Sequence, residues 1–383
     1  MDLSLFFDPL EDKFSALVAD NNVGQSLYSY THQVPELDGM HMALIGITES
    51  RGHASNSTGI AESADAIRGQ FYSLRRGAAG AKIVDLGNLR NGPTLADTYQ
   101  RIQEVGSYLL SKEIIPIFFG GTRDMIYAQY SCYAEANESV NMMICDAKVD
   151  LSAEAGNSYL NKIIHHVPSK LFQLYHLGHQ SYWTNSEDFN TFSALHFEAI
   201  RLGTVKEKLK EMEPLIRDSH LMSFNLAALN HFYAPASLDS GPYGFNGEEA
   251  CQLTWYAGLN DNLSSMGFYD MDADRDDSRQ STAFVVATMI WYFIEGYCHR
   301  VSDKDFQSEN FLIYEVAMKG EPESIRFFKS TRSEKWWMEV PDSGESKTVF
   351  MRNKMVPCSY EDYEMAVNGE IPGRWLGVHA RLS

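Results

Sequence analysis

Residues 113–124 read Glu-Ile-Ile-Pro-Ile-Phe-Phe-Gly-Gly-Thr-Arg-Asp. The apolar run 113–119 stops at a glycine pair, a pattern typical of a buried strand that ends in a tight turn. The polar residues Thr122, Arg123 and Asp124 follow that turn, and the pattern from 122 to 136 predicts a helix. Strand, glycine turn and helix in this order indicate a βα unit of a parallel sheet.

Two other segments have the same layout. Asp146-Ala147-Lys148-Val149-Asp150 begins at the end of a predicted strand at 140–146. Ser223-Phe224-Asn225-Leu226-Ala227-Ala228-Leu229-Asn230 begins at the end of another, at 219–224. Open parallel sheets bind ligands at the carboxyl ends of their strands. We therefore expect the three polar segments to converge in one cleft.

The rest of the chain repeats this alternation of short apolar runs and helical patterns. Strands are expected at 41–47, 82–86, 113–119, 140–146, 171–177, 193–197, 219–224 and 264–269. Helices are expected at 58–76, 94–111, 122–136, 157–166, 246–260 and 281–299. Asn246 is the expected N-cap of the helix at 246–260, because two glutamates follow it in the first turn. Residues 1–300 thus form the expected main α/β domain.

Residues 301–383 are expected to form a C-terminal extension that packs on the main domain. Strands are predicted at 311–318 and 325–329, and a short helix is predicted to begin at Ser359. The extension is rich in aromatic residues, among them Trp336, Trp337 and Trp375. An extension with three tryptophans is expected to be packed, and it would either cover a sheet edge or make a contact between subunits.

Composition excludes several classes of function. The formal net charge of −19 over 383 residues argues against binding to nucleic acid or to anionic membranes. The longest apolar run, 283–294, is too short to span a bilayer. The five cysteines contain no C-x-x-C pair, which argues against a zinc or redox motif. The start Met1-Asp2-Leu3-Ser4 lacks the pattern of a signal peptide, so we expect a cytoplasmic protein.

The three polar segments resemble the signature motifs of the ureohydrolase family, which includes arginase, agmatinase and formiminoglutamase. The family motifs are G-G-D-H-S, D-A-H-x-D and S-x-D-x-D-x-x-D-P. Further likenesses follow in the family's order over roughly residues 40–300. The first two are Arg51-Gly52 followed by Asp65-Ala66-Ile67-Arg68, and Val84-Asp85-Leu86-Gly87-Asn88. The last two are Pro242 to Glu249, and Phe268-Tyr269-Asp270 followed by Thr282-Ala283. The resemblance implies the arginase-like fold, a three-layer α/β/α sandwich around an eight-stranded parallel sheet.

In the family, the three motifs bring two histidines and four aspartates onto two manganese ions. Here Asp146 and Asp150 stand at ligand positions, whereas Arg123 and Lys148 replace the histidines and Asn225 and Ala227 replace two aspartates. Arginine offers no lone pair to a metal, lysine is a cation at its usual pKa, and alanine has no donor. The resemblance therefore implies a degenerate metal site, and no cofactor is expected.

Charge counting suggests what replaces the metal. The carboxylates of Asp146 and Asp150 balance the cations of Arg123 and Lys148, and buried charges need such partners. We hypothesise that salt bridges occupy the metal positions, with Lys148 paired to Asp146. The alternative is that these residues lie apart on exposed loops.

Asp270 matches the position of the family's glutamate that holds the guanidinium or amidine group of the substrate. The resemblance thus implies a small guanidinium or amidine ligand. The alternative is that Asp270 is one member of an acidic loop that continues to Asp277. That loop lacks the glycine and the glutamate of an EF-hand, which argues against a calcium site.

Four histidines form a second candidate metal site: His165, His166, His176 and His179. Imidazole suits zinc, copper and nickel. However, a strand at 171–177 would place His176 and His179 on opposite faces, and the adjacent His165 and His166 would diverge on a helix. This spacing favours histidines without a metal.

Three hypotheses for function follow. The chain is a metal-free pseudoenzyme of the ureohydrolase type that serves as a ligand-binding or assembly module, which we expect to be a homo-oligomer. Alternatively, it is an active hydrolase of linear amidines or guanidines with an altered or single-metal manganese site. As a third possibility, it is a structural protein that acts through the extension 311–383.

Overall fold

The computed structural model describes residues 1–382 except 12–13, 15–16, 54–56, 78–79, 136–138, 150, 152–157, 307 and 342–354. Asp150, one of the two carboxylates expected at the degenerate metal site, lies outside the described residues.

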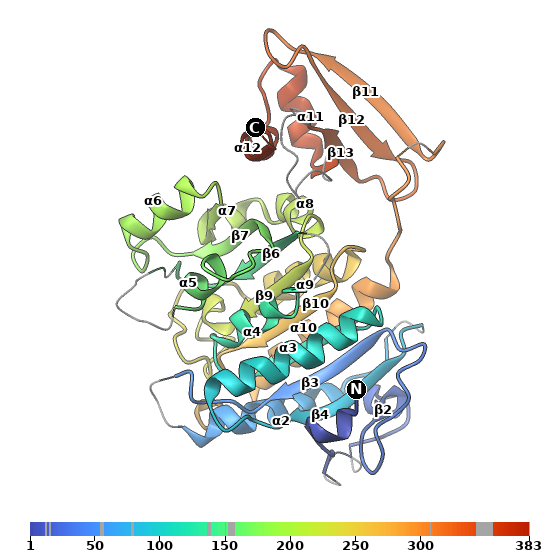
Figure 1. The fold of residues 1–383 in the computed structure, drawn as a ribbon, viewed down its shortest axis with the longest axis vertical. Coiled ribbons are helices and arrows are strands. Elements are labelled where there is room, and N and C mark those ends of the chain that lie inside the picture. Colours follow the sequence, from blue (N-terminus) through green and yellow to red (C-terminus); the bar gives the residue numbers. More distant parts are fainter. Residues whose placement is uncertain are drawn as a thin grey trace.

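A mostly parallel sheet forms the centre of the main domain (Figure 1). Its parallel strands are β3 (Met42–Ile47), β4 (Ile83–Leu89), β5 (Ile115–Gly120), β6 (Val140–Cys145), β7 (Leu171–His179), β8 (Glu198–Arg201), β9 (Leu221–Asn225) and β10 (Ser265–Tyr269). They lie in the order β4-β3-β5-β10-β9-β6-β7-β8. Two short strands, β1 (Phe7–Asp8) and β2 (Tyr28–Ser29), pair with β4 and complete a ten-stranded sheet. The predicted sandwich with its eight parallel strands is confirmed, with β1 and β2 as additions.

Helices cover both faces of this sheet. They are α2 (Thr58–Ser73), α3 (Leu95–Ser111), α4 (Met125–Ser131), α5 (Tyr159–Ile164), α6 (Ser186–Ala194), α7 (Leu202–Glu207), α8 (Glu213–Arg217), α9 (Gly247–Leu259) and α10 (Ser281–Cys298). The predicted N-cap of α9 is confirmed, because the side chain of Asn246 accepts a hydrogen bond from the backbone of Glu249 and Glu249 returns one.

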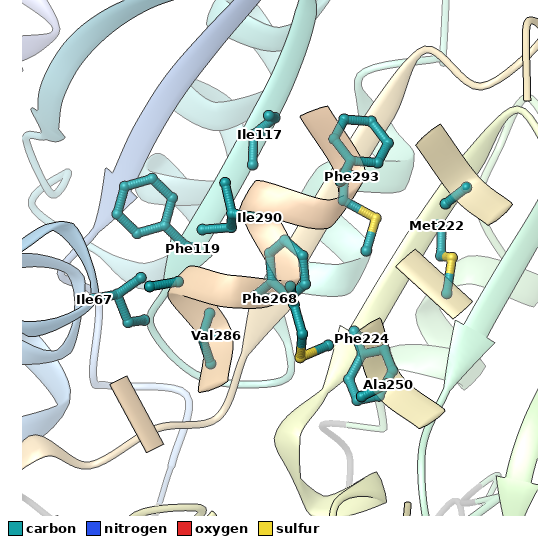
Figure 2. Packing of buried hydrophobic residues seen from close by; sticks show 14 of the residues in the cluster. Ile67, Ile117, Phe119, Met222, Phe224, Ala250, Phe268, Val286, Ile290 and Phe293 are labelled. Carbon is teal, nitrogen blue, oxygen red and sulfur yellow. The ribbon is translucent and has the colours of Figure 1, made fainter. Parts of the chain in front are cut away.

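The core has two halves, one on each face of the sheet. Along β3, Met42 and Leu44 belong to one cluster, and Ala43 and Ile45 belong to the other, as the alternation of a strand requires. Figure 2 shows the cluster that contains Met42 and Leu44, in which Val286, Ile290 and Phe293 of α10 lie against side chains of the strands. The apolar run 283–294 is thus part of the helix that packs on the sheet, and no described helix meets the length and hydropathy that a membrane crossing requires.

One predicted strand is wrong. Residues 193–197 are the end of α6 and the turn after it, where His196 has a φ of +55°, and the strand β8 begins only at Glu198. The apolar letters misled the prediction because Leu195 is 38% exposed and therefore does not mark a buried strand. The helices α6, α7 and α8 were not predicted.

The C-terminal extension contains its own antiparallel sheet, drawn in orange and red in Figure 1. Its strands are β11 (Phe311–Ala317), β12 (Ser324–Ser330), β13 (Trp336–Glu339) and β14 (Met355–Cys358), followed by α11 (Tyr360–Val367) and α12 (Gly373–Leu382). The expected strands and the start of a helix after Ser359 are confirmed, and the three tryptophans are buried.

Arg217, at the end of α8, joins this sheet to the main domain. Its guanidinium donates hydrogen bonds to the backbone oxygens of Trp336 (3.1 Å) and Cys358 (3.3 Å), and it lies 4.3 Å from the ring centroid of Trp337. The extension also reaches the region beside β8, where Arg381 donates to the backbone oxygen of Leu195 at 3.0 Å. Charged hydrogen bonds and aromatic stacking therefore hold the two parts together.

Asp218, next to Arg217, predicts a pH dependence of stability. Its carboxylate accepts hydrogen bonds from Tyr175 and Asn141, both at 2.7 Å, and burial raises its pKa from 3.8 to about 6. Because the folded-state pKa is the higher one, the stabilising contribution is complete below about pH 4 and is lost as the pH rises through 6. Wild type should therefore lose stability relative to Asp218→Asn between pH 4 and pH 7, as measured by urea unfolding. The exposed control Glu62→Gln should track wild type, and an Asp218→Asn profile parallel to wild type would contradict the assignment.

Candidate functional site

Three turns meet at the carboxyl edge of the sheet, because β5, β10, β9 and β6 are consecutive neighbours there. The first turn depends on its glycines. Gly120 and Gly121 have φ values of +89° and +70°, and a Cβ on Gly120 would lie 2.6 Å from the backbone oxygen of Ile47. The turn carries Arg123 across the edge of the sheet towards the end of β10.

Arg123 contacts two carboxylates. Its Nε lies 3.1 Å from Oδ2 of Asp270, and its backbone N–H donates to Oδ1 of the same residue at 3.3 Å. A terminal nitrogen of the guanidinium also donates to the carboxylate of Asp239. Asp270 follows β10 directly, has no exposed surface, and has a left-handed φ of +81°. The Arg123 side chain is 21% exposed, so its guanidinium reaches the protein surface whereas the carboxylate of Asp270 does not.

The charges of this pair depend on each other. Burial raises the pKa of Asp270, and the Arg123 guanidinium works against that rise. Burial also opposes the charge of Arg123, but the carboxylates of Asp270 and Asp146 outweigh burial and raise the pKa of the guanidinium. Arg123 is therefore a permanent cation, and it is the closest counter-charge that Asp270 has among the described residues.

Asp146 is held by neutral donors. Its Oδ2 accepts hydrogen bonds from Nδ2 of Asn225 at 2.7 Å and from the hydroxyl of Tyr159 at 3.0 Å. Its Oδ1 accepts from the backbone N–H of Lys148 at 3.3 Å. The side-chain oxygen of Asn225 accepts from the backbone N–H of Ala227 at 3.0 Å. Both side-chain atoms of Asn225 are thus engaged within the protein, and the buried Ala227 adds no donor.

Lys148 has a different partner from the one expected. Its Nζ lies 3.7 Å from Oδ2 of Asp239 and 5.3 Å from the ring centroid of Trp183. Within the described residues, only the backbone of Lys148 contacts Asp146. The predicted pairing of Lys148 with Asp146 is therefore wrong. The structure does bring Arg123, Asp146, Lys148, Asn225 and Ala227 to one edge of the sheet, as the positions of the three segments predicted, and Asp270 joins them from the end of β10.

Sequence reasoning missed Asp239, Tyr159 and Trp183. Asp239 contacts both Arg123 and Lys148, yet it lies in the loop that follows the third segment and belongs to no quoted motif. The count of charges did not point to it, because Asp146 and Asp150 already balance Arg123 and Lys148 in that count. Tyr159 and Trp183 offered no signal, since aromatic residues are frequent along this chain.

The acidic loop after Asp270 has a structural role. Asp272 and Asp274 accept hydrogen bonds from Ser57 and Gly59 at the start of α2. Asp276 accepts from the backbone N–H groups of Thr282 and Ala283 at the start of α10. Carboxylates at helix N-termini are stabilising. Asp270 stands apart from this loop, because it is buried and pairs with Arg123.

The residues at the matched positions do not fit a pair of manganese ions. Arg123 and Lys148 are cations, Ala227 has no donor, and Asn225 is engaged by Asp146 and Ala227. In the part of the chain that the structure describes, no group of three or more histidine, cysteine, aspartate and glutamate side chains is arranged to hold a metal ion. We therefore derive no metal-dependent step.

The histidine prediction needs a correction. His176 and His179 do not point to opposite faces, because their ring centroids lie 6.2 Å apart. Gly178 between them has a φ of +93°, which breaks the strand alternation. Burial lowers the pKa of both imidazoles, that of His179 to about 4, so both are neutral at pH 7. His165 bonds to the backbone of Asn161 instead, while the ring of His166 packs on Tyr130.

Comparison with known proteins identifies the family and the fold. Residues 40–295 match the sequence profile of the Arginase family. The structure is similar to formimidoylglutamase from Bacillus subtilis subsp. subtilis str. 168, with a TM-score of 0.63 and 17% identity over 72% of this chain and 92% of that one. It is also similar to Trypanosoma cruzi formiminoglutamase with Mn2+, with a TM-score of 0.62 and 14% identity over 77% and 100% of the two chains.

A third similar structure is agmatine ureohydrolase of Thermoplasma volcanium, with a TM-score of 0.58 and 18% identity over 76% of this chain and 100% of that one. No curated protein matches the chain in sequence.

Proposed function

The chain belongs to the arginase family, and we propose that it is a metal-free pseudoenzyme of that family which acts as a ligand-binding or assembly module. One observation carries the proposal: the guanidinium of Arg123 lies between the carboxylates of Asp270 and Asp239, at the position matched to a metal-binding histidine. A cation there repels a metal ion and neutralises the carboxylates that remain.

The same contact bears on substrate binding. Asp270 matches the acidic residue that holds the guanidinium or amidine of a substrate in the family. In this chain, a guanidinium of the protein itself is already 3.1 Å from that carboxylate. A free guanidinium or amidine ligand would have to displace Arg123, which is also held by Asp239. We therefore expect such ligands to bind weakly.

Under this proposal the protein has no metal-activated hydroxide to act as the nucleophile of hydrolysis. A metal-activated hydroxide requires an ion with an open coordination position and a bound water of lowered pKa. Asp146 is the one described carboxylate at a matched ligand position, and it is satisfied by Asn225, Tyr159 and the backbone of Lys148. An active hydrolase with a single manganese ion is the competing function, and the engagement of Asp146 works against it.

The proposal predicts the outcome of a combined metal and activity test. After dialysis against manganese, the purified protein should contain far less than one manganese per chain by mass spectrometry. It should release no urea or formamide above background from arginine, agmatine or formiminoglutamate, because it has no activated water. Formimidoylglutamase from Bacillus subtilis serves as the positive control of the assay. Stoichiometric manganese together with metal-dependent turnover would overturn the pseudoenzyme proposal and favour the hydrolase.

A further inference from the structure

A groove of about 460 Å³ lies between α9 and α10, and none of its residues belongs to the Arg123–Asp270 network. It uses the sides of these helices that do not face the sheet, since the sheet-facing side chains of α10 are Val286, Ile290 and Phe293 (Figure 2). Its lining consists of Tyr233, Gly247, Glu248, Cys251, Gln252, Trp255, Phe284, Val285, Thr288 and Tyr292.

The packing of the two helices explains the groove. At their C-terminal ends the backbones touch, because a Cβ on Gly258 would lie 2.2 Å from the backbone oxygen of Phe293 and 2.8 Å from Cα of Gly296. The preceding turns carry large side chains, among them Trp255 and Tyr292. Small residues permit close approach at one end, and large residues border the hollow at the other. The groove is therefore built into the helix pair.

Aromatic rings dominate the lining. Tyr233 is 39% exposed, Phe284 is 45% exposed and Tyr292 is 41% exposed, and the partly buried Trp255 adds a fourth ring. Contiguous exposed apolar groups in a concave site mark a binding surface. The faces of such rings carry negative partial charge and attract organic cations, with tryptophan the strongest.

A single carboxylate completes the groove. Glu248 is the one acidic residue of the lining, is exposed, and has no hydrogen bond or ion pair with any described residue. Its neighbour Glu249 is already engaged, by the capping box of α9 and by Lys206 at 2.8 Å. Two other polar side chains of the lining have hydrogen-bond partners: Gln252 donates to Tyr256, and Thr288 donates to the backbone of Val285. Burial raises the pKa of Cys251 to about 11, so this thiol is neutral. Apart from the N-terminus of α9, in whose first turn Glu248 lies, the negative charge of this lining has no partner among the described residues.

We propose that this groove binds a small organic cation whose ammonium group is methylated. Four aromatic side chains with an unpaired carboxylate at their side match such a group in both charge and polarity. The groove volume lies within the range of small-molecule sites. This site is independent of the metal-free cleft, so either proposal can fail without the other.

Calorimetry with a matched pair of probes tests the charge requirement. Choline carries a trimethylammonium group, and 3,3-dimethylbutan-1-ol is its neutral counterpart of nearly the same shape. We expect wild type to bind choline about tenfold more tightly than the alcohol. We expect the variants Trp255→Ala and Glu248→Gln to bind choline about fivefold more weakly than wild type does. The effect of Glu248→Gln should shrink at high salt, because screening weakens an exposed charge pair.

Matched controls separate this site from general surface effects. Glu207→Gln removes an exposed carboxylate outside the groove, and Tyr360→Ala removes a ring that is 53% exposed in the extension. Both should bind choline as wild type does, and circular dichroism should show that every variant is folded. Equal binding of choline and the alcohol, or no binding of choline, would overturn the proposal. So would sedimentation in which wild type is an oligomer and Trp255→Ala is a monomer, because a second copy would then occupy the groove.

Discussion

Replacing Arg123 with alanine is expected to destabilise the fold by about 3–5 kcal/mol, because the change leaves the buried carboxylate of Asp270 without its nearest counter-charge. Asp270 has no exposed surface, and its carboxylate receives both the Nε contact and a backbone hydrogen bond from Arg123. Removing the guanidinium also leaves Asp239 with only Lys148 as its counter-charge among the described residues. Urea unfolding at pH 7 measures the change.

Lys148→Ala is the matched control from the same cleft. The Lys148 side chain is 31% exposed, and its Nζ lies 3.7 Å from a carboxylate that is itself 33% exposed. Exposed pairs of this kind contribute about 0–1 kcal/mol, so the loss should be far smaller than for Arg123. The double variant Arg123→Ala with Asp270→Asn should lose much less than the sum of the single changes. Strict additivity would show that the two side chains do not interact, and would remove the support for a salt bridge at the metal position.

The three motif segments predicted the fold well because strand ends and turns are determined by residues that are close together in the sequence. A glycine pair after an apolar run requires a turn at the end of a strand, and Gly120 and Gly121 do have the left-handed φ values that such a turn needs. Parallel strands then bring their carboxyl ends together, so Arg123, Asp146 and Asn225 had to meet at one edge. The predicted N-cap at Asn246 succeeded for the same reason, because a cap is decided within four residues.

Pairings between distant segments could not be predicted from the sequence. Arg123 and Asp239 are separated by 116 positions, and no periodicity relates them. The expected Lys148–Asp146 pair was based on charge alone. In the structure the long side chain of Lys148 extends to Asp239 and to the face of Trp183 instead. The strand rule failed at His176 and His179 because one residue, Gly178, has a positive φ there. Such local breaks depend on tertiary packing rather than on composition.

A second large loss of stability is expected for Arg68→Met, on the order of 3–5 kcal/mol, although Arg68 lies outside the cleft. Arg68 is fully buried in α2. Its Nε donates to Asp85 at 2.9 Å, and its terminal nitrogens donate to Asn88 at 2.9 Å and to the backbone oxygen of Gly87 at 3.1 Å. Asp85 is also fully buried, so losing Arg68 leaves it with the hydroxyl of Tyr72 at 3.2 Å as a side-chain donor. Thermal and urea unfolding would both report the loss.

Arg68→Lys and Arg76→Met give this prediction its controls. Lysine keeps the charge but lacks the planar fork that bonds Asp85 and Asn88 together, so Arg68→Lys should recover only part of the stability. Arg76 is exposed just beyond the same helix, and its substitution should change stability by less than about 0.5 kcal/mol. The network also leaves no spare room, since a Cβ on Gly46 of β3 would lie 2.0 Å from the side-chain oxygen of Asn88. If Arg68→Lys were as stable as wild type, a positive charge alone would be sufficient to stabilise the carboxylate of Asp85. The contact between α2 and β4 would then depend on electrostatics rather than on the geometry of the guanidinium.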